Sequence, residues 1–513
     1  MPKINIKEYD NTTSGITSYE NFTVVVPGFV SASTASAYAG VADENGIVEF
    51  TDQSTFKSLA GQVPSETPPI TAVAPTALAI PSDEMDAFKF YNTYVDKLYT
   101  RAEDAEATTI GYLVEYDANT QTYYRYTKVI IPPAEFDESV QYYVIEPGNE
   151  GRDAVPGSVN NHYGNQIAYE LLGMGYTVLY KQIVTSISEL DSTAFWDCLR
   201  DKATYDFRYL VTGLLDNNTA ANNRISEIAA YTNKNIDTYN PLTDGRGDCI
   251  ALVDVKASAY SSTSSQATNI NGIVAEVSNL TSADKNSFIC APTVTYTFND
   301  TVYNNATLPA SFHYLACAAY AFDTLGYREW YAVSGFTRGI SKYTVAVTGC
   351  KLGDAAVNIL QPRVQKAGSP NKAVNVVMKI RDSYYFFGNR TAALLPTVDS
   401  GNDLKASHFA NIRQLCTTIK KRVYMACKKY QFDPNSTVLW INFKNEIEPT
   451  LAAMQSNQGI KDYDFIKVVS SKKALMSAII RIVPIEAVED FDISLTLEDS
   501  LSGAGTVIVS DND

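Results

Sequence analysis

The sequence predicts a multidomain protein of mixed α/β and α+β class, with a β-rich N-terminal region, an α/β middle region and an α+β C-terminal region. Its 513 residues are enough for about three to four domains. An apolar share of 45% with only 19% charged residues allows large cores to be buried, which excludes general disorder. The pattern of strands and helices changes near residues 150 and 345, and these changes separate the three regions.

The N-terminal region, residues 21–150, begins with a buried strand at 23–26 that stops at Pro27. A stretch rich in Pro, Ala and Thr at 62–82 predicts a linker or a long loop. Tyrosine-rich residues 112–131 then predict a hairpin that turns at 117–119. We therefore expect a β-rich region with an inserted segment, preceded by a polar N-terminal arm at 1–20.

Residues 151–345 alternate helices with short apolar strands, a pattern typical of a mostly parallel sheet covered by helices. The expected helices span 165–172, 193–200, 222–232 and 311–324, and the expected strands span 176–180, 208–211, 249–253 and 293–298. A stretch rich in Ser, Thr and Ala at 256–270 predicts a loop.

The C-terminal region, residues 346–500, differs from the middle one in the order of its elements. Expected strands at 374–380 and 384–387 are followed by helices at 404–430 and 446–454 and by a strand at 477–484. Strict alternation at 491–497 predicts a strand with one buried face. Residues 501–513 form an expected C-terminal arm.

Charge and composition limit the partners of the chain. It has 41 basic and 57 acidic residues, a net charge of −16, which argues against direct nucleic-acid contact because phosphate binding needs a basic face. No apolar run approaches 18 residues and no apolar signal core begins the sequence, so we expect neither membrane insertion nor secretion. Seven scattered cysteines without a C-x-x-C pair predict buried free thiols in a reducing compartment.

The residues that could carry catalysis or hold a cofactor form no recognised pattern. His162, His313 and His408 fit no zinc spacing, and no G-x-S-x-G motif is present. Gly173 and Gly175 follow a helix and precede a strand, the reverse of the order in a phosphate-binding loop, and a helix cap explains them. We therefore expect no catalytic site, no metal site and no cofactor.

The expected helix at 404–430 has the strongest local charge. It contains seven basic residues and no acidic one, whereas residues 486–513 contain eight acidic residues and no basic one. An apolar stripe at helical spacing marks the inner face of the helix. The basic residues expected on the outer face are Arg413, Lys420, Lys421, Lys428 and Lys429. A solvated face is the ordinary explanation, but this asymmetry favours a charged contact within the chain or between copies.

Each end of the chain carries a short apolar run that polar or Gly residues separate from the rest. These runs contain Ile4 and Ile6 at one end and Val507, Ile508 and Val509 at the other. A tethered strand needs a partner, because its backbone groups are otherwise unpaired. Addition to the edge of another subunit's sheet would pair them, so we expect both ends to be inter-subunit arms.

Several short motifs follow one another in a recognisable order. The C-terminal third contains F-G-N-R-T at 387–391, N-I-R-Q-L at 411–415 and F-D-P-N at 432–435, with Leu439-Trp440 just after. Looser matches upstream are V-P-G-F-V at 26–30, F-K-S-L-A-G at 56–61 and L-P-A-S at 308–311. In this order they resemble the contractile tail sheath proteins of myovirus-type phages and related injection systems. Asp433 replaces the usual Glu and no Gly follows Ser311, as in a distant branch of that family.

The resemblance implies a structural protein that polymerises helically around a tail tube and contracts to drive the tube through the host cell envelope. It implies a non-catalytic, subtilisin-like middle domain and a C-terminal sheath domain completed by N- and C-terminal strands, with the basic helix facing the tube. The implied partners are further copies of the chain, the tube protein, and baseplate and tail terminator proteins. The implied location is the virion tail, after assembly in the cytoplasm of a bacterial host. The alternatives are a hydrolase or protease-like enzyme on the middle domain, or another virion protein such as a capsid or tube subunit.

Overall fold

A computed structural model describes residues 22–30, 34–60, 162–216, 218–232, 234, 237–296, 306–341, 344–347, 352–398, 403–468, 475–485 and 487, together with the backbone of five strands between 76 and 145. Among the described residues, no helix is both long enough and apolar enough to cross a membrane.

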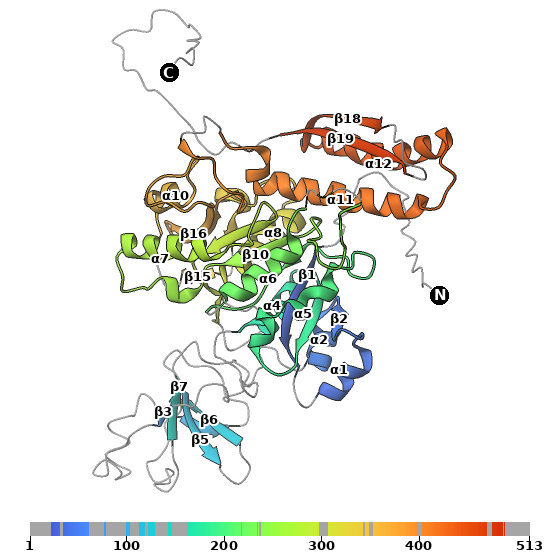
Figure 1. Cartoon of the computed structure of the whole chain (residues 1–513). Helices are drawn as coiled ribbons and strands as arrows, with labels where there is room; N and C mark the ends of the chain where they lie inside the picture. Colours follow the sequence, from blue (N-terminus) through green and yellow to red (C-terminus); the bar gives the residue numbers. More distant parts are fainter. Residues whose placement is uncertain are drawn as a thin grey trace, which may run out of the picture.

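A mixed sheet of nine described strands forms the centre of the protein (Figure 1). Its order is β14-β17-β16-β11-β10-β9-β1-β8-β2. The six inner strands run parallel: β16 (Val374–Ile380), β11 (Ser287–Ala291), β10 (Ile250–Asp254), β9 (Tyr209–Leu210), β1 (Thr23–Phe29) and β8 (Thr177–Ile183). Antiparallel strands complete both edges, namely β17 (Ser383–Phe387) and β14 (Ile340–Ser341) at one and β2 (Ile47–Phe50) at the other. The prediction of a mixed α/β protein with a mostly parallel sheet is confirmed.

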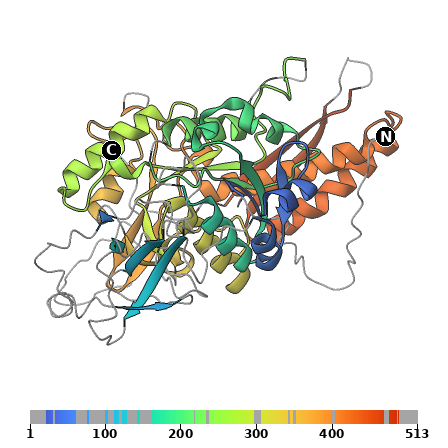
Figure 2. The same cartoon turned by 90° about the horizontal axis from the view of Figure 1, so that it is seen from below.

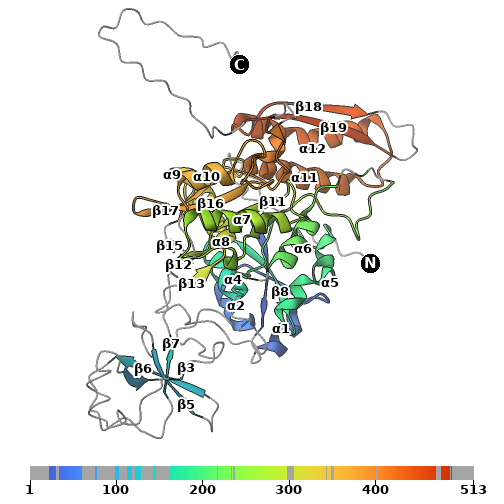
Figure 3. The same ribbon diagram turned by 60° about the vertical axis from the view of Figure 1, so that its left-hand side comes forward.

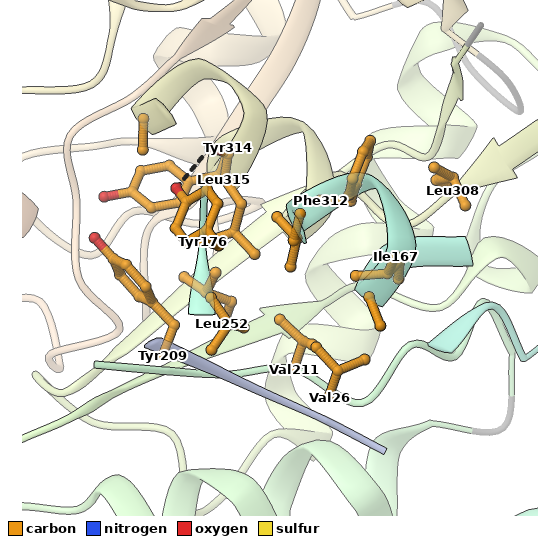
Figure 4. Packing of buried hydrophobic residues seen from close by; sticks show 14 of the residues in the cluster. Val26, Ile167, Tyr176, Tyr209, Val211, Leu252, Leu308, Phe312, Tyr314 and Leu315 are labelled. Carbon is orange, nitrogen blue, oxygen red and sulfur yellow. Dashed lines mark hydrogen bonds between the residues drawn. The ribbon is translucent and has the colours of Figure 1, made fainter. Parts of the chain in front are cut away.

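Helices cover both faces of this sheet, so each inner strand is apolar on both sides. One core is formed with α1 (Ala35–Val41), α2 (Gln53–Ala60), α4 (Gly164–Gly173) and α8 (Ala310–Ala319). The opposite core is formed with α5 (Thr193–Trp196), α6 (Thr219–Ala229), α7 (Gln266–Asn279) and α10 (Asp354–Leu360). Figure 4 shows the first core, where Val26, Val211 and Leu252 from the sheet lie below Phe312 and Leu315. There the Tyr176 hydroxyl donates a hydrogen bond of 2.8 Å to the Leu315 carbonyl.

Short elements connect these layers. They are η3 (Ile187–Asp191), η4 (Asp197–Arg200), η5 (Ala257–Ala259), the π-helical turn η6 (Tyr320–Thr324), α9 (Gly335–Arg338) and η8 (Ala406–His408). A separate antiparallel sheet contains β13 (Ala306–Leu308), β12 (Val294–Tyr296) and β15 (Thr344–Val347).

The C-terminal unit consists of two long helices and a hairpin with a core of their own. Helices α11 (Ala410–Tyr430) and α12 (Thr437–Ser456) lie side by side, and β18 (Ile460–Val468) pairs with β19 (Ser477–Pro484) above them (Figures 1 and 2). Leu415, Phe443, Leu451 and Phe465 are among the buried residues that join the three layers. The predicted strand at 477–484 is confirmed, whereas the helix expected from 404 begins at 410.

A second antiparallel sheet lies between residues 76 and 145. Its order is β3-β7-β5-β6-β4, with β3 (Thr76–Ala77), β7 (Tyr142–Ile145), β5 (Tyr112–Asp117), β6 (Thr122–Lys128) and β4 (Tyr99–Ala102). Strands β5 and β6 form the hairpin that the tyrosine-rich stretch predicted.

Two features of the fold differ from the sequence interpretation. Residues 256–270, expected to be a loop, contain the start of α7, whose N-cap Ser265 accepts a 3.2 Å hydrogen bond from the Thr268 amide. Gly272 within α7 allows the close approach of the preceding turn, because a Cβ there would come within 1.9 Å of the Ala259 carbonyl oxygen. The boundaries expected at 150 and 345 do not separate independent sheets. Strands β1 and β2, which precede residue 150, and strands β16 and β17, which follow residue 345, belong to the same nine-stranded sheet as the strands between.

Candidate interaction surfaces on the C-terminal unit

Helix α11 lies along the end of the sheet at which the parallel strands begin (Figures 1 and 3). Its partners lie shortly before strands: Arg208, just before β9, donates a 2.9 Å hydrogen bond from Nη2 to Thr418 Oγ1, and Lys420 Nζ donates a 2.7 Å hydrogen bond to the carbonyl of Gly247, three residues before β10. Gln414 also hydrogen-bonds the hydroxyl of Tyr314. The contact between α11 and the sheet therefore contains many polar groups, although the opposite face of α11 joins the apolar core of the C-terminal unit.

The five basic residues that were expected on one outer face of α11 lie on different sides of the helix. Arg413 is only 6% exposed, and Lys420 and Lys421 bind Gly247 and Asp206 on the side of the sheet. The expectation of a single outer face is therefore wrong for these three residues. Helical spacing alone could not reveal this, because α11 has two covered sides, one toward α12 and one toward the sheet.

Lys428 and Lys429 are exposed in the last turn of α11, where positive charge complements the helix dipole. Lys429 Nζ lies 2.7 Å from Glu446 Oε2 on α12, and Lys428 Nζ lies 3.5 Å from Gln431 Oε1. Large apolar side chains are exposed around this end of the helix pair: Met425, Phe432, Val438 and Ile441. Phe432 is 96% exposed and has a φ of 79°, a conformation that a non-glycine residue seldom adopts. The end of the helix pair where α11 finishes and α12 begins, which we call the far end, is therefore a mixed basic and apolar surface.

The β18–β19 hairpin presents unfilled edges. One face packs on α12 through Phe465, Ile480 and Ile482. Among the described strands, β18 and β19 pair only with each other, so each leaves one edge for a further strand. Such edges can accept an added strand through backbone hydrogen bonds. The predicted arm residues Ile4, Ile6, Val507, Ile508 and Val509 lie outside the described residues, as do the strand expected at 491–497 and the arms at 1–20 and 501–513.

A buried carboxylate at the end of β10 caps helix α8. Asp254 accepts hydrogen bonds from the Ser311 amide at 2.8 Å and the Ser311 hydroxyl at 2.6 Å. Complete burial raises the pKa of Asp254 to about 7, although these hydrogen bonds act in the opposite direction. A serine in contact with an aspartate could belong to a catalytic site, but here Asp254 caps the first turn of α8.

The histidines do not join this pair. His313 Nδ1 lies 3.0 Å from Thr344 Oγ1, and His408 contacts the carbonyls of Lys405 and Leu394. Burial lowers the pKa of His162 to about 4 and that of His313 to about 3. Among the described residues, no histidine hydrogen-bonds a serine or an aspartate, and no group of three His, Cys, Asp or Glu side chains could hold a metal.

Two motifs that are distant in the sequence meet at the start of α11. Asn389 Nδ2, just after β17, donates a 2.8 Å hydrogen bond to Asn411 Oδ1, and the Asn411 amide donates one of 3.1 Å to Asn389 Oδ1. Asn411 Nδ2 also donates to the Trp330 carbonyl at 3.1 Å. Nothing in the sequence pattern predicted these contacts, although both asparagines lie within the quoted motifs.

Comparisons with known proteins give structural neighbours only. No protein-family model matches the chain, and no curated protein matches its sequence. Its fold is similar to a chain of the anti-feeding prophage baseplate, with 11% identity and a TM-score of 0.44, covering 65% of this chain and 80% of that one. It is similar to the PVC sheath complex of an extracellular contractile injection system in its contracted state, with 13% identity and a TM-score of 0.44, covering 67% and 82%. It is also similar to a sheath tail protein from Desulfitobacterium hafniense, with 10% identity and a TM-score of 0.38, covering 93% and 100%.

Proposed function

We propose that this chain is the structural subunit of a contractile tail sheath, which polymerises helically around a tube and shortens to drive the tube through a cell envelope. The observation that carries the proposal is the β18–β19 hairpin, which is packed on α12 by one face and has an unfilled edge on each side among the described residues. The chain also supplies two short apolar runs at its ends, which are suitable as added strands.

Weak links of this kind suit a polymer that must change shape. A strand addition forms about four to six backbone hydrogen bonds at about 1 kcal/mol each, so one addition stabilises a contact by only a few kcal/mol. Many repeated links hold a polymer together, while each can tilt as neighbouring subunits rotate. Contacts between different surfaces of identical copies give an open helix when the rotation between copies does not close into a ring.

The order of the motifs supports the same function. F-G-N-R-T ends β17 and N-I-R-Q-L begins α11, and the two are joined by the hydrogen bonds between Asn389 and Asn411. F-D-P-N forms the turn between α11 and α12. The motifs of the C-terminal third thus lie at two places: the contact between β17 and the start of α11, and the turn at the far end of the helix pair.

Further parts of the proposal follow from the resemblance. The helix-covered sheet would be the subtilisin-like domain, which acts as a scaffold without catalysis. Lys428 and Lys429, at the exposed end of α11, would face the tube protein, while Lys420 and Lys421 would hold α11 to the sheet. Baseplate and tail terminator proteins would bind the two ends of the polymer. The polymer would assemble in a bacterial cytoplasm and act in a phage tail or a related particle.

Electron microscopy of the purified chain tests this function. A sheath subunit is expected to form long tubes of constant diameter, alone or on a supplied tube. A protein that remains monomeric at all concentrations, or that forms closed shells, would contradict the proposal.

A further inference from the structure

Three cationic side chains converge where α11 meets the sheet. Arg413 and Lys420 lie two turns apart on α11, and Lys285 lies two residues before the start of β11. The ammonium groups of Lys285 and Lys420 lie 3.7 and 4.5 Å from the centroid of the Tyr231 ring. We call Arg413, Lys420 and Lys285 the cationic cluster. It reaches the surface through Lys285 and Tyr231, which are partly exposed.

Two carboxylates, Asp284 and Asp248, lie close enough to the cationic cluster to attract it electrostatically, but among the described residues neither forms an ion pair with it. Asp284 accepts the amides of Tyr231 at 3.0 Å and Asn286 at 2.7 Å. Asp248 pairs with Arg246 at 2.9 Å. Lys420 donates to a neutral carbonyl, that of Gly247.

Arg413 is the member of the cationic cluster whose buried N–H groups lack hydrogen-bond acceptors among the described residues. It is only 6% exposed, and its Nε and Nη2 atoms form no hydrogen bond with any of the described residues. Burial, followed by repulsion from Arg413, lowers the pKa of Lys420 to about 7. A buried guanidinium with unpaired N–H groups is strongly unfavourable unless an anion compensates it.

We propose that the cationic cluster is a carboxylate-binding site for the acidic C-terminal segment, residues 486–513. This segment has eight acidic residues and no basic one, and four of the eight, Glu486, Glu489, Asp490 and Asp492, occur within its first seven residues. Charge complementarity therefore favours this segment over other parts of the chain. The carboxylates come from the same copy, because Ile485, just before the segment, lies beside the first turn of its own α11.

The path of the chain supports this occupant. The amide of Ile485 donates a 3.2 Å hydrogen bond to the Gly459 carbonyl, and Gly459 lies against the Trp330 ring. The Trp330 carbonyl accepts from Asn411, two residues before Arg413. The segment thus starts beside the first turn of α11. Seven extended residues span about 23 Å, which exceeds the diameter of a helix, about 10 Å, so its first carboxylates can reach the other side of α11.

Zero-length cross-linking with a carbodiimide tests the site on the unmodified full-length chain. The reagent joins an amine to a carboxylate in contact with it, and mass spectrometry identifies the pair. We expect Lys285 or Lys420 to be joined to Glu486, Glu489, Asp490 or Asp492. Lys444, which lies 3.4 Å from Glu448 on α12, is the control and is expected to join Glu448 only. Mixing ¹⁵N-labelled and unlabelled chains distinguishes a link within one copy, which we expect, from a link between copies, which would contradict the assignment to the same copy.

Links of Lys285 and Lys420 only to carboxylates before residue 486, or no links at all, would overturn the proposal. A double-mutant cycle is the second measurement. Replacing the four acidic residues by their amides should lower the urea midpoint of the parent chain, and this loss should disappear in the Arg413→Gln background. The control variant Asp511→Asn/Asp513→Asn should leave the midpoint unchanged. An equal loss in both backgrounds would contradict the site. These measurements do not depend on polymerisation, so their result is independent of the sheath proposal.

Discussion

Asn389 and Asn411 form a reciprocal pair of hydrogen bonds, of 2.8 and 3.1 Å, that joins the end of β17 to the first turn of α11. Both side chains are buried, and Asn411 also holds the Trp330 carbonyl. The pair is therefore one of the contacts that hold the C-terminal unit on the sheet, beside those of Arg208 with Thr418 and of Lys420 with Gly247.

Removing one member of this pair should destabilise the subunit. In Asn411→Ala, the Trp330 carbonyl and the Asn389 amide lose a buried partner, and we expect the free energy of unfolding to fall by about 2 kcal/mol. Urea denaturation measures this change. Gln455→Ala is the matched control, because its hydrogen bond to the Lys461 carbonyl is exposed, and it should cost well under 1 kcal/mol. Equal effects of the two changes would show that the asparagine pair has no special role.

Asp254 should make the stability of the subunit depend on pH. Its pKa is raised from 3.8 to about 7, so between these values the folded state holds a proton that the unfolded state has lost. Its contribution to stability is therefore complete below about pH 4 and is lost as the pH rises through about 7. Asp254→Asn cannot titrate, so its free energy of unfolding should fall less than that of the parent between pH 4 and 7. The exposed change Asp464→Asn serves as the control, and parallel pH profiles for Asp254→Asn and the parent would refute the assignment.

Deleting either arm should abolish polymerisation without unfolding the subunit. Chains lacking residues 1–10 or 505–513 keep every element of the described sheet, so their circular dichroism and thermal midpoint should match the parent. They should fail to form tubes in electron micrographs, because the hairpin edges lose their added strands. Unchanged tube formation by both truncated chains would refute the role of the arms.

Charge reversal should separate the two groups of basic residues on α11. Lys428→Glu with Lys429→Glu should weaken docking on the tube at only a small cost in subunit stability, since both side chains are exposed and the interactions affected, the exposed pair with Glu446 and that with the helix dipole, are weak. Added salt should weaken docking of the parent in the same way, by screening. Lys420→Glu with Lys421→Glu should instead destabilise the subunit, because these residues hold Gly247 and Asp206. Co-sedimentation with the tube measures docking, and urea denaturation measures stability. If neither salt nor the changes at Lys428 and Lys429 weakened docking, the proposal that this basic end faces the tube would be contradicted.

The sequence predicted the elements whose periodicity is undisturbed and missed those that depend on tertiary contact. The β-branched run at 23–26 and the hairpin at 112–128 carry local signals, and both elements are present. The start of α7 was missed because the Ser, Thr and Ala content of 256–270 favoured a loop, whereas the packing of Ile270, Ile273 and Val277 in the core holds the helix. The burial of Arg413 and Lys420 could not be predicted, since the covering residues 231, 247 and 285 are far away in the sequence.

Tracing both arms in a cryo-electron microscopy map of the assembled polymer tests the proposed linkage most directly. We predict that residues 1–20 and 501–513 of each copy cross to neighbouring copies and add strands to the outer edges of β18 and β19. A map in which both ends of every copy fold back onto their own hairpin, with no strand shared between copies, would contradict it.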